Sequence, residues 1–139
     1  MDWITLFAAV IAASISGIMT FAVTKFKYNV TLKKDKRDRL NALLEKIYQY
    51  DEQNEQEPAL SDLEYFINRF CFCDAQYNIA KPLISDKYCC ELDELRVQTT
   101  IPSEGCCDPN HHSKFIDAHV NFEKTLITSI QNQLKELYA

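Results

Sequence analysis

Residues 3 to 23 form an uncharged and mostly apolar run of 21 residues that directly follows Asp2. As a helix rising 1.5 Å per residue, such a run is roughly 31 Å long, close to the hydrocarbon thickness of a bilayer. A cleaved signal peptide would have a basic region before a shorter apolar core, and only Met1 and Asp2 precede this run. A buried helix of a soluble protein would show a polar stripe. We therefore expect residues 1–28 to form a transmembrane anchor.

Basic residues after the run predict its orientation. Residues 25 to 39 contain seven basic and two acidic side chains, hence a net charge of +5: Lys25, Lys27, Lys33, Lys34, Lys36, Arg37 and Arg39 against Asp35 and Asp38. Because basic flanks stay in the cytosol, we expect a single-pass protein of the inner (plasma) membrane with its N-terminus outside and its C-terminal domain cytosolic. The basic stretch either contacts anionic headgroups of the lipid bilayer or serves only as a topology signal.

Small side chains gather on one face of the run. Two rows recur at a spacing of four residues: Ala8, Ala12, Ser16 and Thr20 in one row, and Ala9, Ala13 and Gly17 in the other. Small side chains let two helix backbones approach closely in lipid. This face predicts a homo-oligomer formed through the transmembrane helix, with a lone anchor of incidental alanine content as the alternative.

The remainder of the chain predicts an all-α fold. Two glycines and four prolines are too few for the turns of a many-stranded sheet. Residues 29–57 predict a juxtamembrane basic helix and linker, with an apolar stripe at Leu40, Leu43, Leu44 and Ile47 and a solvated loop from Tyr50 to Glu57. Residues 58–139 predict an acidic helical domain. The architecture expected is one N-terminal transmembrane helix that continues into a small cytosolic helical bundle.

Three helices are expected in the acidic domain. The capping box Ser61–Glu64 starts the first, whose stripe contains Leu63, Phe66, Ile67, Phe70 and Cys71 and is interrupted at Asp74. A shorter helix is expected at about 85–97, with Tyr88, Cys89, Leu92 and Leu95 facing inward. The last starts at Asp108 and Pro109, and its stripe contains Phe115, His119, Phe122, Leu126, Ile130, Leu134 and Leu137. Beyond residue 39 there are 17 acidic and 8 basic residues, a net charge of −9, which argues against direct nucleic-acid binding.

Six cysteines occur in three close pairs: Cys71 and Cys73, Cys89 and Cys90, and Cys106 and Cys107. One interpretation is reduced, mostly buried thiols, as in many cytosolic proteins. A second is a zinc site built from Cys89, Cys90, Cys106, Cys107, His111 and His112, although C-x-x-C spacing is missing. A third is disulfides, which would place the domain outside the cell. Apart from zinc in the second interpretation, no cofactor is expected.

Nothing in the sequence indicates catalysis. Phosphate-binding glycine loops, a G-x-S-x-G elbow and an H-E-x-x-H helix are missing, so an enzyme is not expected. A cysteine nucleophile at Cys106 or Cys107 would need His111 or His112 and the nearby helix N-terminus, where Asp108 opposes a thiolate. His119 lies on an apolar stripe and is expected to be a core or interface histidine. With His112, Asp108 and Glu123 it has the spacing of a proton-handling patch, which helices also produce by chance.

The residues Met1–Thr5, the alanine-rich run and Lys33–Leu40, together with Leu63–Ile67, Phe70 and Cys71, resemble small single-pass bacterial membrane proteins of the kind found in anti-phage defence or prophage loci. The resemblance covers about the first half of the chain and transfers no functional residue. It implies a bacterial defence or toxin-like effector that acts at the membrane. Together with the small-residue face, it leads us to expect an effector that oligomerises in the bilayer and has a cytosolic protein partner. Two alternatives stay open: a cell-envelope or phage lysis structural protein with an external disulfide-bonded domain, and a zinc-binding regulatory domain tethered to the membrane.

Overall fold

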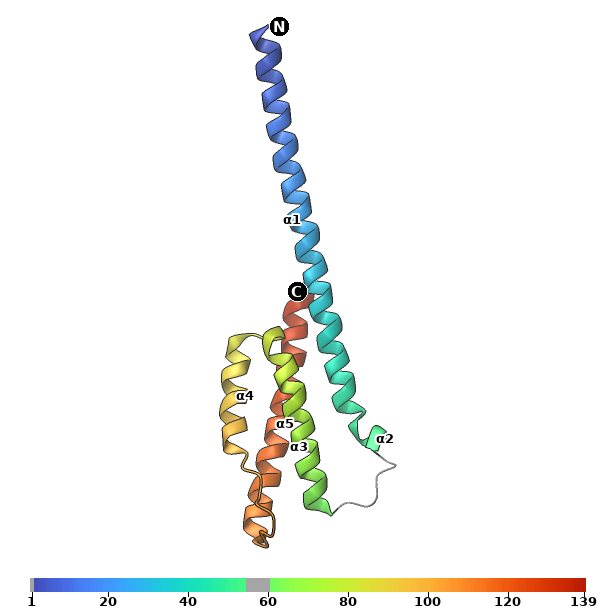
Figure 1. The fold of residues 1–139 in the computed structure, drawn as a ribbon, viewed down its shortest axis with the longest axis vertical. Coiled ribbons are helices and arrows are strands. Elements are labelled where there is room, and N and C mark those ends of the chain that lie inside the picture. Colours follow the sequence, from blue (N-terminus) through green and yellow to red (C-terminus); the bar gives the residue numbers. More distant parts are fainter. Residues whose placement is uncertain (1, 55–60) are drawn as a thin grey trace. The chain divides into compact units, whose positions relative to one another are not determined.

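The computed structural model describes residues 2–54 and 61–139, and the regular elements of this part are all helices (Figure 1). They are α1 (Trp3–Tyr48), α2 (Tyr50–Asn54), α3 (Asp62–Ala80), the 3-10 turn η1 (Lys81–Leu83), α4 (Asp86–Gln98) and α5 (Pro109–Tyr138). The all-α prediction is confirmed. The chain divides into two compact units, Met1–Lys36 and Arg37–Ala139, and α1 begins in the first and ends in the second.

The first unit is the N-terminal part of α1, a single helix with no core of its own. Every described side chain up to residue 35 is exposed, among them the large apolar Trp3, Ile4 and Phe7. The hydroxyl groups of Ser14 and Thr20 donate to backbone carbonyls four residues earlier, at 2.8 Å each, and so are satisfied within the helix. Among the described residues α1 is the one helix long and apolar enough to span a membrane.

The second unit has a hydrophobic core to which every long helix contributes. Helix α5 packs against both α3 and α4, and its inward stripe is buried from Phe115 to Leu134, as predicted. The end of α1 adds Leu40, Leu43, Leu44 and Ile47. Two contacts show that this segment runs alongside α5: Arg37 stacks on Tyr138 of α5, and the Tyr48 hydroxyl accepts from Gln131 of α5. Residues expected in the juxtamembrane helix are therefore part of the second unit's core.

Local signals fix the helix ends of the second unit. Ser61 and Glu64 form the predicted capping box at α3, and the Asp108 carboxylate accepts from the Asn110 amide at the start of α5. Helix α4 begins differently: the Ser85 side chain does not cap it. The Gln133 side chain on α5 accepts from both the amide and the hydroxyl of Ser85, each at 2.7 Å.

The structure corrects two predictions. Tyr50–Asn54 is the short helix α2 and not a loop, because Tyr50 is buried against Phe72 with ring centroids 4.8 Å apart. The rest of the predicted loop, residues 55–57, lies outside the described residues. Cys71 is exposed, and the inward position is taken by Cys73, 1% exposed. In α3 the buried row continues from Phe70 at steps of three and four residues, which brings residue 73 and not 71 to the core.

Candidate functional site

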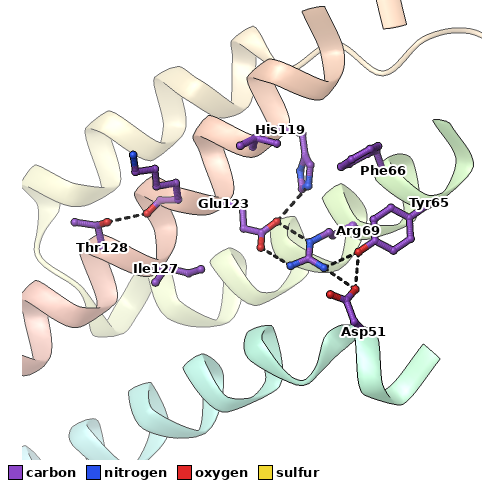
Figure 2. A pocket seen from close by; sticks show the side chains of 10 residues that line it. Asp51, Tyr65, Phe66, Arg69, His119, Glu123, Ile127 and Thr128 are labelled. Carbon is purple, nitrogen blue, oxygen red and sulfur yellow. Dashed lines mark hydrogen bonds and ion pairs between the residues drawn. The ribbon is translucent and has the colours of Figure 1, made fainter. Parts of the chain in front are cut away.

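A groove of about 500 Å³ lies between α3 and α5, with α2 at its edge (Figure 2). This is within the size range of small-ligand pockets. Its apolar side chains are Phe66 on α3 and Val120 and Ile127 on α5. Its polar side chains include Arg69 and Glu123, which point toward each other and are in contact. The groove thus combines an apolar wall with a charged cluster at one end.

Arg69 is the centre of the charged cluster and connects three helices. Its Nε and Nη2 donate to Oε2 and Oε1 of Glu123 on α5, at 2.8 and 2.6 Å. Its Nη1 donates to Oδ1 of Asp51 on α2 at 2.8 Å, and to the Tyr65 hydroxyl one turn earlier on α3, also at 2.8 Å. The Tyr65 hydroxyl in turn donates to the same Asp51 oxygen. The fork geometry of the guanidinium suits these parallel contacts.

The two carboxylates on Arg69 differ in exposure. The Glu123 side chain is 14% exposed and receives two parallel hydrogen bonds, whereas the Asp51 side chain is 61% exposed and accepts through one oxygen. Burial alone would raise the pKa of Glu123, but the Arg69 hydrogen bonds and the contact with His119 outweigh it and hold this pKa at about 2. The hydrogen bond to Glu123 also raises the pKa of Arg69. At neutral pH this end of the groove therefore contains an ionised carboxylate and a guanidinium cation.

His119 lies beneath the groove and is fully buried. Its ring stacks on Phe115 and meets the edges of Phe66 and Phe70, with all three centroid distances between 6.0 and 6.4 Å. Its Nε2 is 3.2 Å from Oε2 of Glu123, within ion-pair distance but not aligned as a hydrogen bond, and its Nδ1 has no hydrogen-bond partner among the described residues. The predicted core position is confirmed, but the polar atoms of the ring are not fully satisfied.

The proton-handling patch suggested by sequence spacing is assembled only in part. His119 and Glu123 are in contact, whereas Asp108 caps α5 and His112 places its Nε2 2.7 Å from the Cys106 carbonyl oxygen. The Cys106 thiol lies 4.0 Å from Nδ1 of His111. The thiol and imidazole of the predicted Cys106–His111 combination are thus close together at the start of α5.

The other predicted zinc ligands lie elsewhere. Cys89 is buried in α4, where its thiol contacts the Lys81 carbonyl at 3.6 Å, and the neighbouring Cys90 is exposed. Cys107 contacts the carbonyl of Gly105, the glycine whose φ of +81° turns the chain between α4 and α5. All six cysteines are free thiols, and the described residues contain no group of three or more His, Cys, Asp or Glu side chains that could hold a metal ion.

The predicted association face of the anchor lies on exposed helix. Ala9, Ala12, Ala13, Ser16 and Gly17 are all exposed in α1. A Cβ atom added to Gly17 would meet no other atom within 4 Å. This face is therefore open along the chain, and its partner stays a prediction.

Sequence reasoning did not single out Arg69, Asp51 or Tyr65. The spacing of His119 and Glu123 indicates a polar cluster on α5, and the same spacing of Tyr65 and Arg69 could have indicated one on α3. That the two clusters meet follows only from the packing of α3 against α5. No protein-family model, curated protein or solved structure matches this chain.

Proposed function

We propose that this chain is a membrane-anchored helical interaction protein of the bacterial inner membrane, with an effector role in anti-phage defence. The first unit supports a membrane anchor, because it is one helix without a core and its large apolar side chains are exposed. Soluble monomers rarely expose contiguous apolar patches beyond a few hundred Å². The hydrocarbon core of a bilayer is an environment in which such a helix is stable with its apolar side chains exposed.

The basic residues after the apolar run support a helix that crosses the headgroup layer. At about 100° per residue, Lys27 lies about 200° around α1 from Lys25, and Lys33 lies about 240° further on. The charges therefore surround the helix. A helix lying in the plane of the membrane would instead gather its apolar residues on one side. We place the second unit in the cytosol, where these charges favour it.

In this proposal the protein acts by assembly. A cytosolic partner acts on the second unit, and the groove around Arg69 is the candidate place of contact. Helix α1 contains both the apolar run and core residues of the second unit. A change in packing around Leu40 and Ile47 would therefore act on the same helix that carries the apolar run. The small-residue face with Gly17 then mediates self-association, and the oligomer disturbs the bilayer.

The experiment for the anchor is a topology test with two reporters fused after Ala139. A fluorescent protein that matures only in the cytosol should be bright, and a phosphatase active only outside should be silent. The opposite pattern would contradict the proposal and favour the external, disulfide-bonded alternative. A matched variant, in which glutamine replaces the five lysines from Lys25 to Lys36, should lose the orientation bias.

The experiment for assembly is a two-hybrid assay for transmembrane helices. Gly17→Ile should weaken self-association, because an added Cβ has room within its own chain while the larger side chain keeps a second helix from approaching closely. Ile11→Phe, about 120° around α1 from Gly17 and outside the small-residue face, is the control and should associate like the wild type. Equal association of both variants and the wild type would rule out this face.

A further inference from the structure

Arg69 donates hydrogen bonds to two carboxylates that differ in their exposure and in how they accept these hydrogen bonds. The Glu123 carboxylate is mostly buried and receives two hydrogen bonds from the guanidinium. The Asp51 carboxylate is mostly exposed, comes from a helix of five residues, and accepts at one oxygen from Arg69 and Tyr65. Exposed ion pairs contribute little to stability. Asp51 is therefore the carboxylate that another anion can replace.

The donors on Arg69 and Tyr65 would remain in place if Asp51 left. The guanidinium is held from its other edge by Glu123, and Tyr65 lies one helical turn from Arg69 on α3. These N–H and O–H groups already converge on a single carboxylate oxygen. They form a preorganised carboxylate position.

The rest of the groove suits an apolar body with a negative end. Phe66, the half-exposed Val120 and Ile127 provide apolar surface next to the Arg69 cluster. Lys124 also lines the groove, and among the described residues its side chain forms no ion pair. Without Asp51, the residues that line the groove include two cations, Arg69 and Lys124, and one carboxylate, Glu123, so the local charge favours an anion.

We propose that this groove binds a carboxylate that carries an apolar body, and that Asp51 occupies the carboxylate position when no ligand is bound. The source of the carboxylate is a small organic acid or an acidic side chain flanked by apolar residues in a partner protein. The inference rests on the proposed function only in taking the groove as the place of contact. Ligand binding releases α2 from Arg69.

The test is a titration of the full chain in detergent micelles, followed by NMR of the Arg69 side chain and the Val120 and Ile127 methyl groups. Phenylacetate is the small-acid probe, and phenylacetamide, which has the same ring but no charge, controls for partition into the micelle. A capped Leu-Glu-Leu peptide is the probe for a protein source. Saturable shifts at the groove with either acid support the proposal. Equal shifts with the amide, or none with both acids, would overturn it.

Variants test the role of Asp51. Asp51→Asn removes the competing charge and should tighten phenylacetate binding about two- to fivefold. Glu52→Gln removes a neighbouring exposed carboxylate of α2 and should leave the affinity unchanged. Lys124→Ala should weaken phenylacetate binding about two- to fivefold, because it removes a cation that lines the groove. This variant provides an independent test if Asp51→Asn does not fold. Tighter binding by both α2 variants alike would mean a general charge effect and overturn the competition. If these variants do not show the expected affinities, the groove proposal fails, and the result of the topology test with two reporters still stands.

Discussion

Arg69 and Glu123 join α3 to α5 by two parallel hydrogen bonds of 2.8 and 2.6 Å across a sequence separation of 54 residues. Both side chains are mostly buried, 17% and 14% exposed. A pair of this kind costs desolvation to form, but losing one partner leaves the other charge buried and uncompensated. The pair therefore fixes which faces of α3 and α5 meet beneath the groove.

Glu123→Gln is expected to destabilise the second unit by about 2 to 4 kcal/mol, because it leaves the Arg69 charge half-compensated. Urea unfolding of the full chain in micelles, followed by near-ultraviolet circular dichroism, measures this loss. Asp117→Asn is the matched control on α5, since Asp117 is exposed, and should change the unfolding free energy by less than about 0.5 kcal/mol. An equal loss in both variants would contradict a specific role for the pair.

The same carboxylate predicts how stability depends on pH. The pKa of Glu123 is held at about 2, below its ordinary value of 4.5, so its ionised form stabilises the folded state. That contribution is complete above pH of about 4.5 and is lost as pH falls towards about 2. The unfolding free energies of the wild type and Glu123→Gln should therefore converge between pH 5 and 2. A difference that stays constant over this window would show that ionisation of Glu123 is not the cause.

Much of the fold was predictable because its signals are local. Helix α5 follows from one long apolar stripe and an Asp–Pro start, and α3 from a capping box of four residues. These features need no knowledge of the partner helices. Assignment of Cys71 to the core was wrong because the stripe of α3 has two plausible edges one residue apart, and packing against α5 selects the edge with Cys73.

The groove was not predictable, because its contacts are tertiary. Asp51 and Arg69 are 18 residues apart, and the segment around Asp51 is polar enough to suggest a solvated loop. It is helical because Tyr50 packs on Phe72, and Asp51 meets two donors on α3. The helix propensity of five residues alone does not predict a helix that such tertiary contacts stabilise.

Gln133→Ala is expected to loosen the start of α4. Its side-chain oxygen accepts from the amide and the hydroxyl of Ser85, the N-cap residue of α4, and so holds the start of α4 against α5. A hydrogen bond of this kind contributes about 0.5 to 1.5 kcal/mol, and hydrogen exchange should speed up for the Ser85 amide and the first-turn amides of α4 while the amides of α3 stay protected. Asn132→Ala, one residue away on α5, is the control. Unchanged exchange in Gln133→Ala would mean that water replaces the two hydrogen bonds of Gln133 without cost.

Thiol reactivity should separate the two cysteines of the first pair. Burial, reinforced by the negative charge of Glu123, raises the pKa of Cys73 to about 12, whereas Cys71 is exposed. Because the thiolate is the nucleophile, Cys71 should react with iodoacetamide at pH 8 at least about tenfold faster than Cys73. Peptide mass spectrometry of the natively alkylated chain measures both rates.

Denaturation in urea without reductant is the control for this comparison, and all six thiols should then react at similar rates. Equal native rates at Cys71 and Cys73 would contradict the inward placement of Cys73. Thiols that stay blocked in urea until reductant is added would instead reveal disulfides. Because disulfides persist in oxidising compartments, that result would move the second unit outside the cell and count against the cytosolic orientation.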